Sequence, residues 1–413
     1  MQSVATSSTR RPLSGEISGA FADLGVLVPL EAALIAINGL NPTSTLLGVG
    51  LAYIIAGRYF GLPMPVQPLK AFAAVAIATQ ASPEVIAAGA LLMSGSMAVI
   101  GLSGAAGFLA RFTPLGVIRG IQLGLAILLL KNGVEFVLDK PFLLQGDDQS
   151  LDVLGGVPWG LPVAIASGLL LLLLLRRPAA PASLAVLAFG AGLGFLIVSP
   201  DASGLLQFGP ASWSFVSPNG ADFATALTLL VIPQIPLTMA NSVVATSDAA
   251  EHYFGQRASR ATPRRLSLSI ALGNLWAGLM GGLPICHGCG GLTAHYRLGA
   301  RTPLATTITG VTLVVIALAF GAAALEVRAV VPYAVYGVLL LYVGAEHLRL
   351  AANSSTVQDR SLTVITALAA FLLGGNLAYG AAAGLAAAAL LACVRLGLPR
   401  LRRAFAASMA IGS

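Results

Sequence analysis

The side chains with the most recognisable chemistry lie between Leu283 and Arg301, in the stretch LPICHGCGGLTAHYRLGAR. Cys286 and Cys289 form a C-x-x-C pattern with His287 between them, and such side chains serve as zinc ligands or redox pairs in other proteins. A zinc or redox site needs a second group of ligands, and the sequence supplies none at a matching spacing. We therefore interpret the cysteines as small, weakly polar residues at a tight helix start, and we expect no metal site and no cofactor.

Glycines in the same stretch indicate a different chemistry, in which the backbone binds the ligand. A helix N-terminus exposes unpaired N–H groups and about half a positive charge, so it attracts anions. Glycine lets an oxyanion approach that backbone closely. We predict a helix that begins inside the membrane and contacts a substrate through His287, Gly288, Cys289 and Gly290. For His287 a purely structural role is the alternative.

A second stretch, GLPMPVQPLK at 61–70, aligns without gaps with GLPICHGCGG at 282–291, although only Gly-Leu-Pro is identical. Its prolines are harmless before or within the first turn of a helix and would cost about 3 kcal/mol deeper inside one. Both stretches therefore look like the beginnings of short half-helices. If the two enter from opposite sides of the membrane, their N-termini face each other near its middle, and they suit an anion rather than a cation.

Side chains beside these two helix starts complete the predicted site. Gln67 and Lys70 are three residues apart and share a helix face, with Pro68 between them. A lysine at membrane depth is costly and usually functional. We expect it to neutralise a dianion, the alternative being a pair with a neighbouring carboxylate. Asn241 suits an anion better than a carboxylate would, the alternative being an interhelical hydrogen bond.

Two carboxylates in the first hydrophobic segment are candidates for carrying a coupling proton. Asp23 and Glu31 are eight residues apart, or about 12 Å along a helix. We expect Glu31 near the middle of the membrane and Asp23 nearer the inner face. A salt bridge to Lys70, or capping of a broken helix, is the alternative role.

Composition decides the protein class that positions these residues. Hydrophobic residues make up 57% of the 413 residues and charged residues 9%, with a mean hydropathy of +0.87. Soluble domains carry about 25% charge, so we predict an all-α polytopic membrane protein that binds no nucleic acid. Hydropathy predicts fourteen segments, of which the third and tenth are too short to span. They cover approximately residues 20–40, 43–60, 66–80, 84–104, 114–136, 159–175, 181–199, 222–245, 265–281, 285–298, 303–325, 331–348, 361–375 and 377–395.

The distribution of charge predicts the orientation. With the N-terminus inside, most of the 23 Lys and Arg residues fall on the inner side, as the positive-inside rule requires. Seven segments precede the outer loop 199–221 and seven follow it, and an odd number per half places the second half upside down. We therefore predict a 7+7 inverted repeat, with cytoplasmic tails at 1–15 and 397–413.

Four blocks of this sequence resemble the molybdate transporter family, a relative of the SulP sulfate permeases that lacks their C-terminal cytosolic domain. They are GEISGAFADLGVLVPL (15–30), PMPVQPLKAFAAVAIA (63–78), PQIPLTMANSVVA (233–245) and PICHGCGGLTAHYRLGAR (284–301). Cys289 departs from the pattern, since a small residue other than cysteine is expected there. The resemblance implies a repeat at 16–200 with core 16–104 and gate 113–200, and an inverted repeat at 219–396 with core 222–325 and gate 330–396.

The expected function is therefore secondary active transport of molybdate by alternating access, in the inner membrane of a bacterium. Sulfate has nearly the same shape and charge, so another oxyanion is an alternative substrate. An anion channel is a further alternative, whereas an enzyme would need a catalytic constellation that we do not find. Lipid, a coupling proton and a second copy in a homodimer are the partners we consider.

Overall fold

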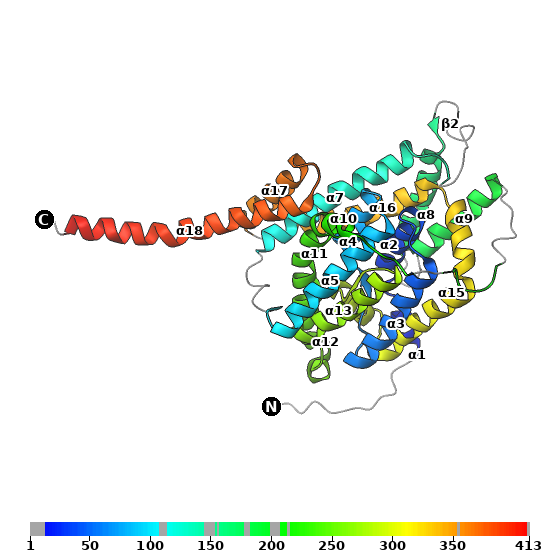
Figure 1. Cartoon of the computed structure of the whole chain (residues 1–413), viewed down its shortest axis with the longest axis horizontal. Coiled ribbons are helices and arrows are strands. Elements are labelled where there is room, and N and C mark those ends of the chain that lie inside the picture. The colour runs from blue at the N-terminus through cyan, green and yellow to red at the C-terminus, as the bar shows by residue number, and fades with distance from the viewer. Residues whose placement is uncertain are drawn as a thin grey trace.

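The computed structural model describes residues 13–106, 114–143, 153–154, 157–176, 182–198, 207–212, 215–352 and 356–410. The predicted tail 1–15 and the predicted outer loop 199–221 lie partly outside these ranges. Within them the protein is a bundle of helices, and the strands are two-residue pairs (Figure 1). The helical class that we predicted from composition and hydropathy is confirmed.

Each hydrophobic segment of the first half coincides with a helix. The segment predicted over 20–40 corresponds to the second helix, which begins at Leu24, and a separate helix that ends at Ala20 precedes it. Asp23 is the residue before the second helix, a position that aspartate tolerates better than a helix interior. The elements are α1 (Leu13–Ala20), α2 (Leu24–Ile37), α3 (Pro42–Phe60), β1 (Gln67–Pro68), α4 (Lys70–Ala78), α5 (Pro83–Ser103), α7 (Leu115–Leu138), β2 (Val153–Leu154), β3 (Val157–Pro158), α8 (Gly160–Leu175) and α9 (Ala182–Val198).

The second half opens with one long helical run that contains two π-helical stretches, η3 and η4. Pro233 and Pro236 lie in α11 between them, and proline cannot donate the hydrogen bond that an α-helix needs. The elements are α10 (Gly220–Ala226), η3 (Leu227–Val231), α11 (Ile232–Leu237), η4 (Thr238–Val244), α12 (Ala245–Phe254), η5 (Gly255–Ala258), α13 (Pro263–Met280), β4 (Ile285–Cys286), α14 (Cys289–Arg297), α15 (Pro303–Val330), α16 (Tyr333–Ala352), α17 (Val357–Leu372) and α18 (Leu377–Ala410).

Six helical spans among the described residues are long and apolar enough to cross a membrane, and α8, α9 and part of α2 are shorter apolar helices. Large apolar side chains are exposed on their outer surfaces, for example Leu196 and Leu172. Such surfaces need lipid around them. The number of fourteen crossings remains a prediction.

Glycines allow the longest helices to pack closely. A Cβ on Gly50 of α3 would lie 2.7 Å from the carbonyl oxygen of Gly310, and a Cβ on Gly310 of α15 would lie 2.5 Å from that of Gly50. Gly133 of α7 and Gly337 of α16 face each other in the same way. A Cβ on Gly133 would lie 2.9 Å from the Gly337 carbonyl oxygen, and a Cβ on Gly337 would lie 2.8 Å from that of Gly133. Small residues of this kind bring helix backbones together in membranes.

The last helix extends beyond the bundle, with the C-terminus at its far end (Figure 1). Its first part packs on α17 and α7. The helix continues to Ala410, so most of the predicted tail 397–413 is helical, because leucine, arginine and alanine favour a helix.

Candidate anion-binding site

The two proline- and glycine-rich stretches lie side by side in the structure. β1 and β4 form an antiparallel pair in which Gln67 is opposite Cys286 and Pro68 is opposite Ile285. The Leu69 N–H donates to the Pro284 carbonyl over 3.0 Å, and the Cys286 Sγ lies 3.6 Å from the Pro68 carbonyl. Prolines in both stretches prevent helix formation here, so the backbone stays extended until the half-helices begin.

Short helices follow each strand directly. α4 begins at Lys70 and α14 begins at Cys289, and neither preceding residue caps its helix with a side chain. Each helix therefore presents first-turn N–H groups at the strand pair. On α4 one of these, the N–H of Phe72, donates to Gln234 Oε1 over 2.9 Å. Gln234 lies beside the site, and its carboxamide stabilises the start of α4.

The predicted contact residues divide into a rim and a floor by their exposure. Partly or fully exposed at the rim are Lys70, Asn241, Cys289 and Gly290, while Gln67, Pro68, His287 and Gly288 are buried beneath them. The rim supplies one cationic side chain, one amide and the backbone of the first turn of α14, which are the groups that bind an oxyanion.

Glycine is required at 288 and 291, where the start of α14 lies against buried polar side chains. A Cβ on Gly288 would lie 1.9 Å from Gln67 Oε1 and 3.5 Å from Asn241 Nδ2. A Cβ on Gly291 would lie 2.6 Å from Asp23 Oδ2 and 2.7 Å from Gln67 Nε2. The two glycines thus allow three polar side chains from different parts of the sequence to meet at the tip of α14.

Asp23 belongs to this polar cluster. Its Oδ1 accepts a hydrogen bond from Gln67 Nε2, and its Oδ2 accepts one from the Tyr53 hydroxyl at 3.4 Å. The break between α1 and α2 allows this placement, because it takes the carboxyl group off the regular helix. Sequence analysis missed Tyr53, an aromatic residue inside an apolar helix that carries no local signal of its role.

His287 is held on both sides by the protein. Its Nδ1 lies 2.8 Å from the Pro65 carbonyl, and its Nε2 lies 2.8 Å from Ser269 Oγ. The Thr246 hydroxyl donates to the His287 carbonyl over 2.7 Å. With 1% of its surface exposed, the imidazole fits the structural alternative, that of fixing the position of β4.

Lys70 takes part in neither ion pair found among the described residues, which are Lys131–Glu135 and Arg349–Glu346. It lies close enough to Asp23 and Cys289 to interact with both electrostatically. The ammonium group is therefore available at the rim, next to the start of its own helix.

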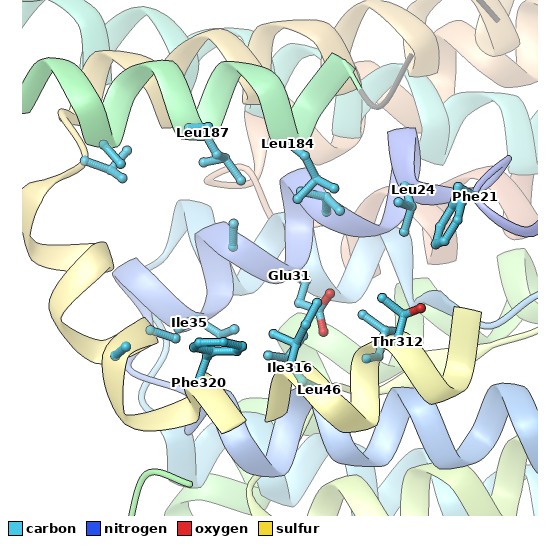
Figure 2. Close-up of a pocket in the computed structure, with 18 of the residues that line it drawn as sticks. Phe21, Leu24, Glu31, Ile35, Leu46, Leu184, Leu187, Thr312, Ile316 and Phe320 are labelled. Carbon is cyan, nitrogen blue, oxygen red and sulfur yellow. The ribbon is translucent and has the colours of Figure 1, made fainter. Parts of the chain in front are cut away.

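Glu31 lies apart from this cluster. Figure 2 shows its carboxyl group in a largely apolar cavity between α2, α9 and α15, in which Thr312 is another polar side chain. The cavity has a volume of about 790 Å³, and Leu184, Ile316 and Phe320 are among the residues that line it. Glu31 is 4% exposed, and its Oε1 has no hydrogen-bond partner within the described chain.

Comparison of the sequence with known proteins identifies a family. Residues 15–129 and 226–346 match the family described as molybdate transporter of the MFS superfamily. Molybdate transporter 2 of Arabidopsis thaliana is 30% identical over 409 residues, which cover 91% of this chain and 86% of that protein.

Solved structures of anion transporters share the fold. The transmembrane domain of a cyanobacterial bicarbonate transporter, BicA, superposes with a TM-score of 0.65 at 17% identity and covers 90% of this chain and 98% of that one. Murine Solute Carrier 26 family member A9, in its inward-facing state, superposes with a TM-score of 0.68 at 16% identity over 94% and 69%. The resemblance seen in the sequence is confirmed, and the chain belongs to the molybdate transporter family.

Proposed function

We propose that the protein binds molybdate at the rim formed by α4, α14 and Asn241 and carries it across the membrane as a secondary active transporter. The observation that carries this proposal is the pair of helix N-termini joined by β1 and β4. Each N-terminus contributes partial positive charge beside the strand pair, and Lys70 adds a full charge. A tetrahedral dianion with four acceptor oxygens is the complementary ligand.

Helix contacts support a 7+7 inverted repeat, because they occur in matching pairs. α13 packs on α5 and α15 packs on α3, which are equivalent contacts if the repeats are exchanged. The same exchange converts the contact of α8 with α9 into that of α17 with α18, and the contact of α2 with α4 into that of α12 with α14. Paired contacts are expected of inverted-repeat transporters.

Movement of a core against a gate is the proposed mechanism. The core contains 16–104 and 222–325, which carry the rim residues, and the gate contains 113–200 and 330–396. The cavity around Glu31 lies between α2 and α15 of the core and α9 of the gate. An apolar, loosely filled boundary of this kind lets two bodies slide without breaking polar contacts.

Proton coupling is proposed through a buried carboxyl group. Asp23 lies in the site, and Glu31 lies at the boundary between core and gate. Uptake of molybdate into proteoliposomes under a pH gradient distinguishes the two residues. If Asp23 carries the proton, Asp23→Asn abolishes the uptake that the pH gradient drives; if Glu31 carries it, Glu31→Gln does so.

The decisive experiment measures binding of molybdate to the purified protein, with sulfate and tungstate as competitors. We expect tungstate to compete with molybdate and sulfate to compete weakly. Equal competition by sulfate would identify a general oxyanion transporter, the second candidate. Acceleration of molybdate efflux by external molybdate distinguishes a transporter from a channel, which shows no such exchange.

Orientation and assembly are part of the proposal. Most basic residues fall inside when both termini are cytoplasmic, and the membrane is proposed to be the bacterial inner membrane. Exposed apolar helix faces contact lipid, and a homodimer would cover part of them.

A further inference from the structure

Asp23 presents an electrostatic problem for the proposed function, on which this inference rests. Its carboxyl group lies beneath a rim that would hold a dianion. Both polar groups that contact it, Gln67 Nε2 and the Tyr53 hydroxyl, donate hydrogen bonds to it. In this arrangement Asp23 is an acceptor, as an ionised carboxylate must be.

The carboxamide of Gln67 transmits this state to the tip of α14. Since its nitrogen is turned toward Asp23, its oxygen is turned toward Gly288. That oxygen is buried and has no hydrogen-bond partner among the described residues. An unpaired acceptor beneath an anion site repels the anion, and leaving it unpaired costs about 1–3 kcal/mol.

A protonated Asp23 reverses the arrangement. The carboxylic acid can donate a hydrogen bond to the carboxamide oxygen of Gln67, and the amide then turns its two N–H donors toward the tip of α14. The two ends of a carboxamide have nearly the same size, so the turn needs no repacking. Gly288 and Gly291 leave both ends free of side-chain contact on the α14 side.

We propose that Gln67 is a relay that reports the protonation of Asp23 to the anion site, so that one proton enters Asp23 with each anion bound. No bond other than that of the proton is made or broken. The proton comes from the aqueous side on which the anion binds, and it leaves to the opposite side when the anion is released. Gln67 is a positioning residue in this scheme.

Other titratable groups face this pair from the neighbouring elements. Tyr53 of α3 contacts Asp23 directly, and its ring lies edge-on to that of His295 of α14 at 6.3 Å. Lys70 of α4 and Cys286 of β4 interact with Asp23 electrostatically, and Glu31 of α2 interacts with Tyr53. None of these groups is seen to hydrogen-bond both Asp23 and the tip of α14 in the described part of the chain, whereas the Gln67 carboxamide lies between the two.

The test is the affinity of the purified full-length chain for molybdate at neutral and mildly acidic pH. The wild type is expected to bind more tightly as the pH falls, by up to about tenfold per pH unit if one proton is taken up. Asp23→Asn keeps a permanent donor toward Gln67, so it should bind tightly and independently of pH. Glu346→Gln, an exposed carboxylate outside the site, should retain the wild-type pH dependence.

A second variant separates the relay from a direct effect of Asp23. Gln67→Met replaces the carboxamide, with both its donor and its acceptor, by an apolar thioether. It should therefore weaken molybdate binding and abolish the pH dependence of that binding while Asp23 is still present. The relay is overturned if Gln67→Met retains the wild-type pH dependence, or if Asp23→Asn, with an unchanged melting temperature, retains it or no longer binds. Failure of the wild type to bind molybdate at any pH would instead overturn the proposed function.

Discussion

The Cα of Gly288 lies against the carboxamide of Gln67, so closely that a Cβ there would be 1.9 Å from Oε1. Gly288→Ala must therefore displace Gln67 from the tip of α14. We expect molybdate binding to weaken by about tenfold or more, which corresponds to about 1.4 kcal/mol. Isothermal titration of the purified variant measures this change.

Gly192 of α9 provides a control outside the predicted rim. A Cβ there meets no atom within 4 Å, and alanine is favoured over glycine inside a helix by about 1 kcal/mol. Gly192→Ala should therefore bind molybdate with an affinity within about twofold of the wild type. Equal losses in the two variants would show that Gln67 is not the cause.

Asn241 tests the sign of the ligand charge. Its Nδ2 lies near the tip of α14 from a π-helical stretch, η4. Asn241→Asp keeps the size of the side chain and adds a negative charge, so molybdate binding should weaken by about a hundredfold, or roughly 2.7 kcal/mol. Asn241→Ser, which stays neutral, should lose far less. A similar loss in both would argue against a dianion at the rim.

His287 is expected to matter for stability rather than for binding. His287→Ala leaves Ser269 and the Pro65 carbonyl without their imidazole partner, which should cost about 1–3 kcal/mol. A lower melting temperature with nearly unchanged molybdate affinity is the expected result. Ser269→Ala removes one of the two contacts and should lower the melting temperature less. Weakened binding at an unchanged melting temperature would assign His287 to the substrate.

The contact between α3 and α15 should tolerate no side chain at Gly310. A Cβ there would lie 2.5 Å from the Gly50 carbonyl oxygen, so Gly310→Ala should destabilise the protein by about 1–3 kcal/mol. Gly95→Ala in α5, where a Cβ meets nothing within 4 Å, should leave stability unchanged or raise it. Melting curves in one detergent compare the two, and equal melting temperatures would contradict the close approach.

Hydropathy and helix-breaking residues were enough to predict most of the secondary structure. Apolar stretches predicted the long helices, because membrane helices need them. Proline at 63, 65 and 68 and glycine at 288 predicted where α4 and α14 begin, because these residues act on their own backbone.

The polar cluster could not be predicted in the same way, because its members are defined by contacts between distant residues. Asp23 was predicted from its own segment alone, whereas its hydrogen-bond partners come from other elements. Tyr53 and Gln234 contact Asp23 and the start of α4, at separations of 30 and 162 residues. No local pattern carries such information.

The strand pair also sets a thermodynamic limit on transport. Because β1 and β4 are joined by backbone hydrogen bonds, α4 and α14 cannot separate without breaking them, so we expect the two helix starts to move as one unit. The intrinsic dissociation constant should then be equal at the two membrane faces. The direction of net flux would follow from the electrochemical gradients of the anion and of the coupled proton, and the same protein would run in reverse when they are inverted.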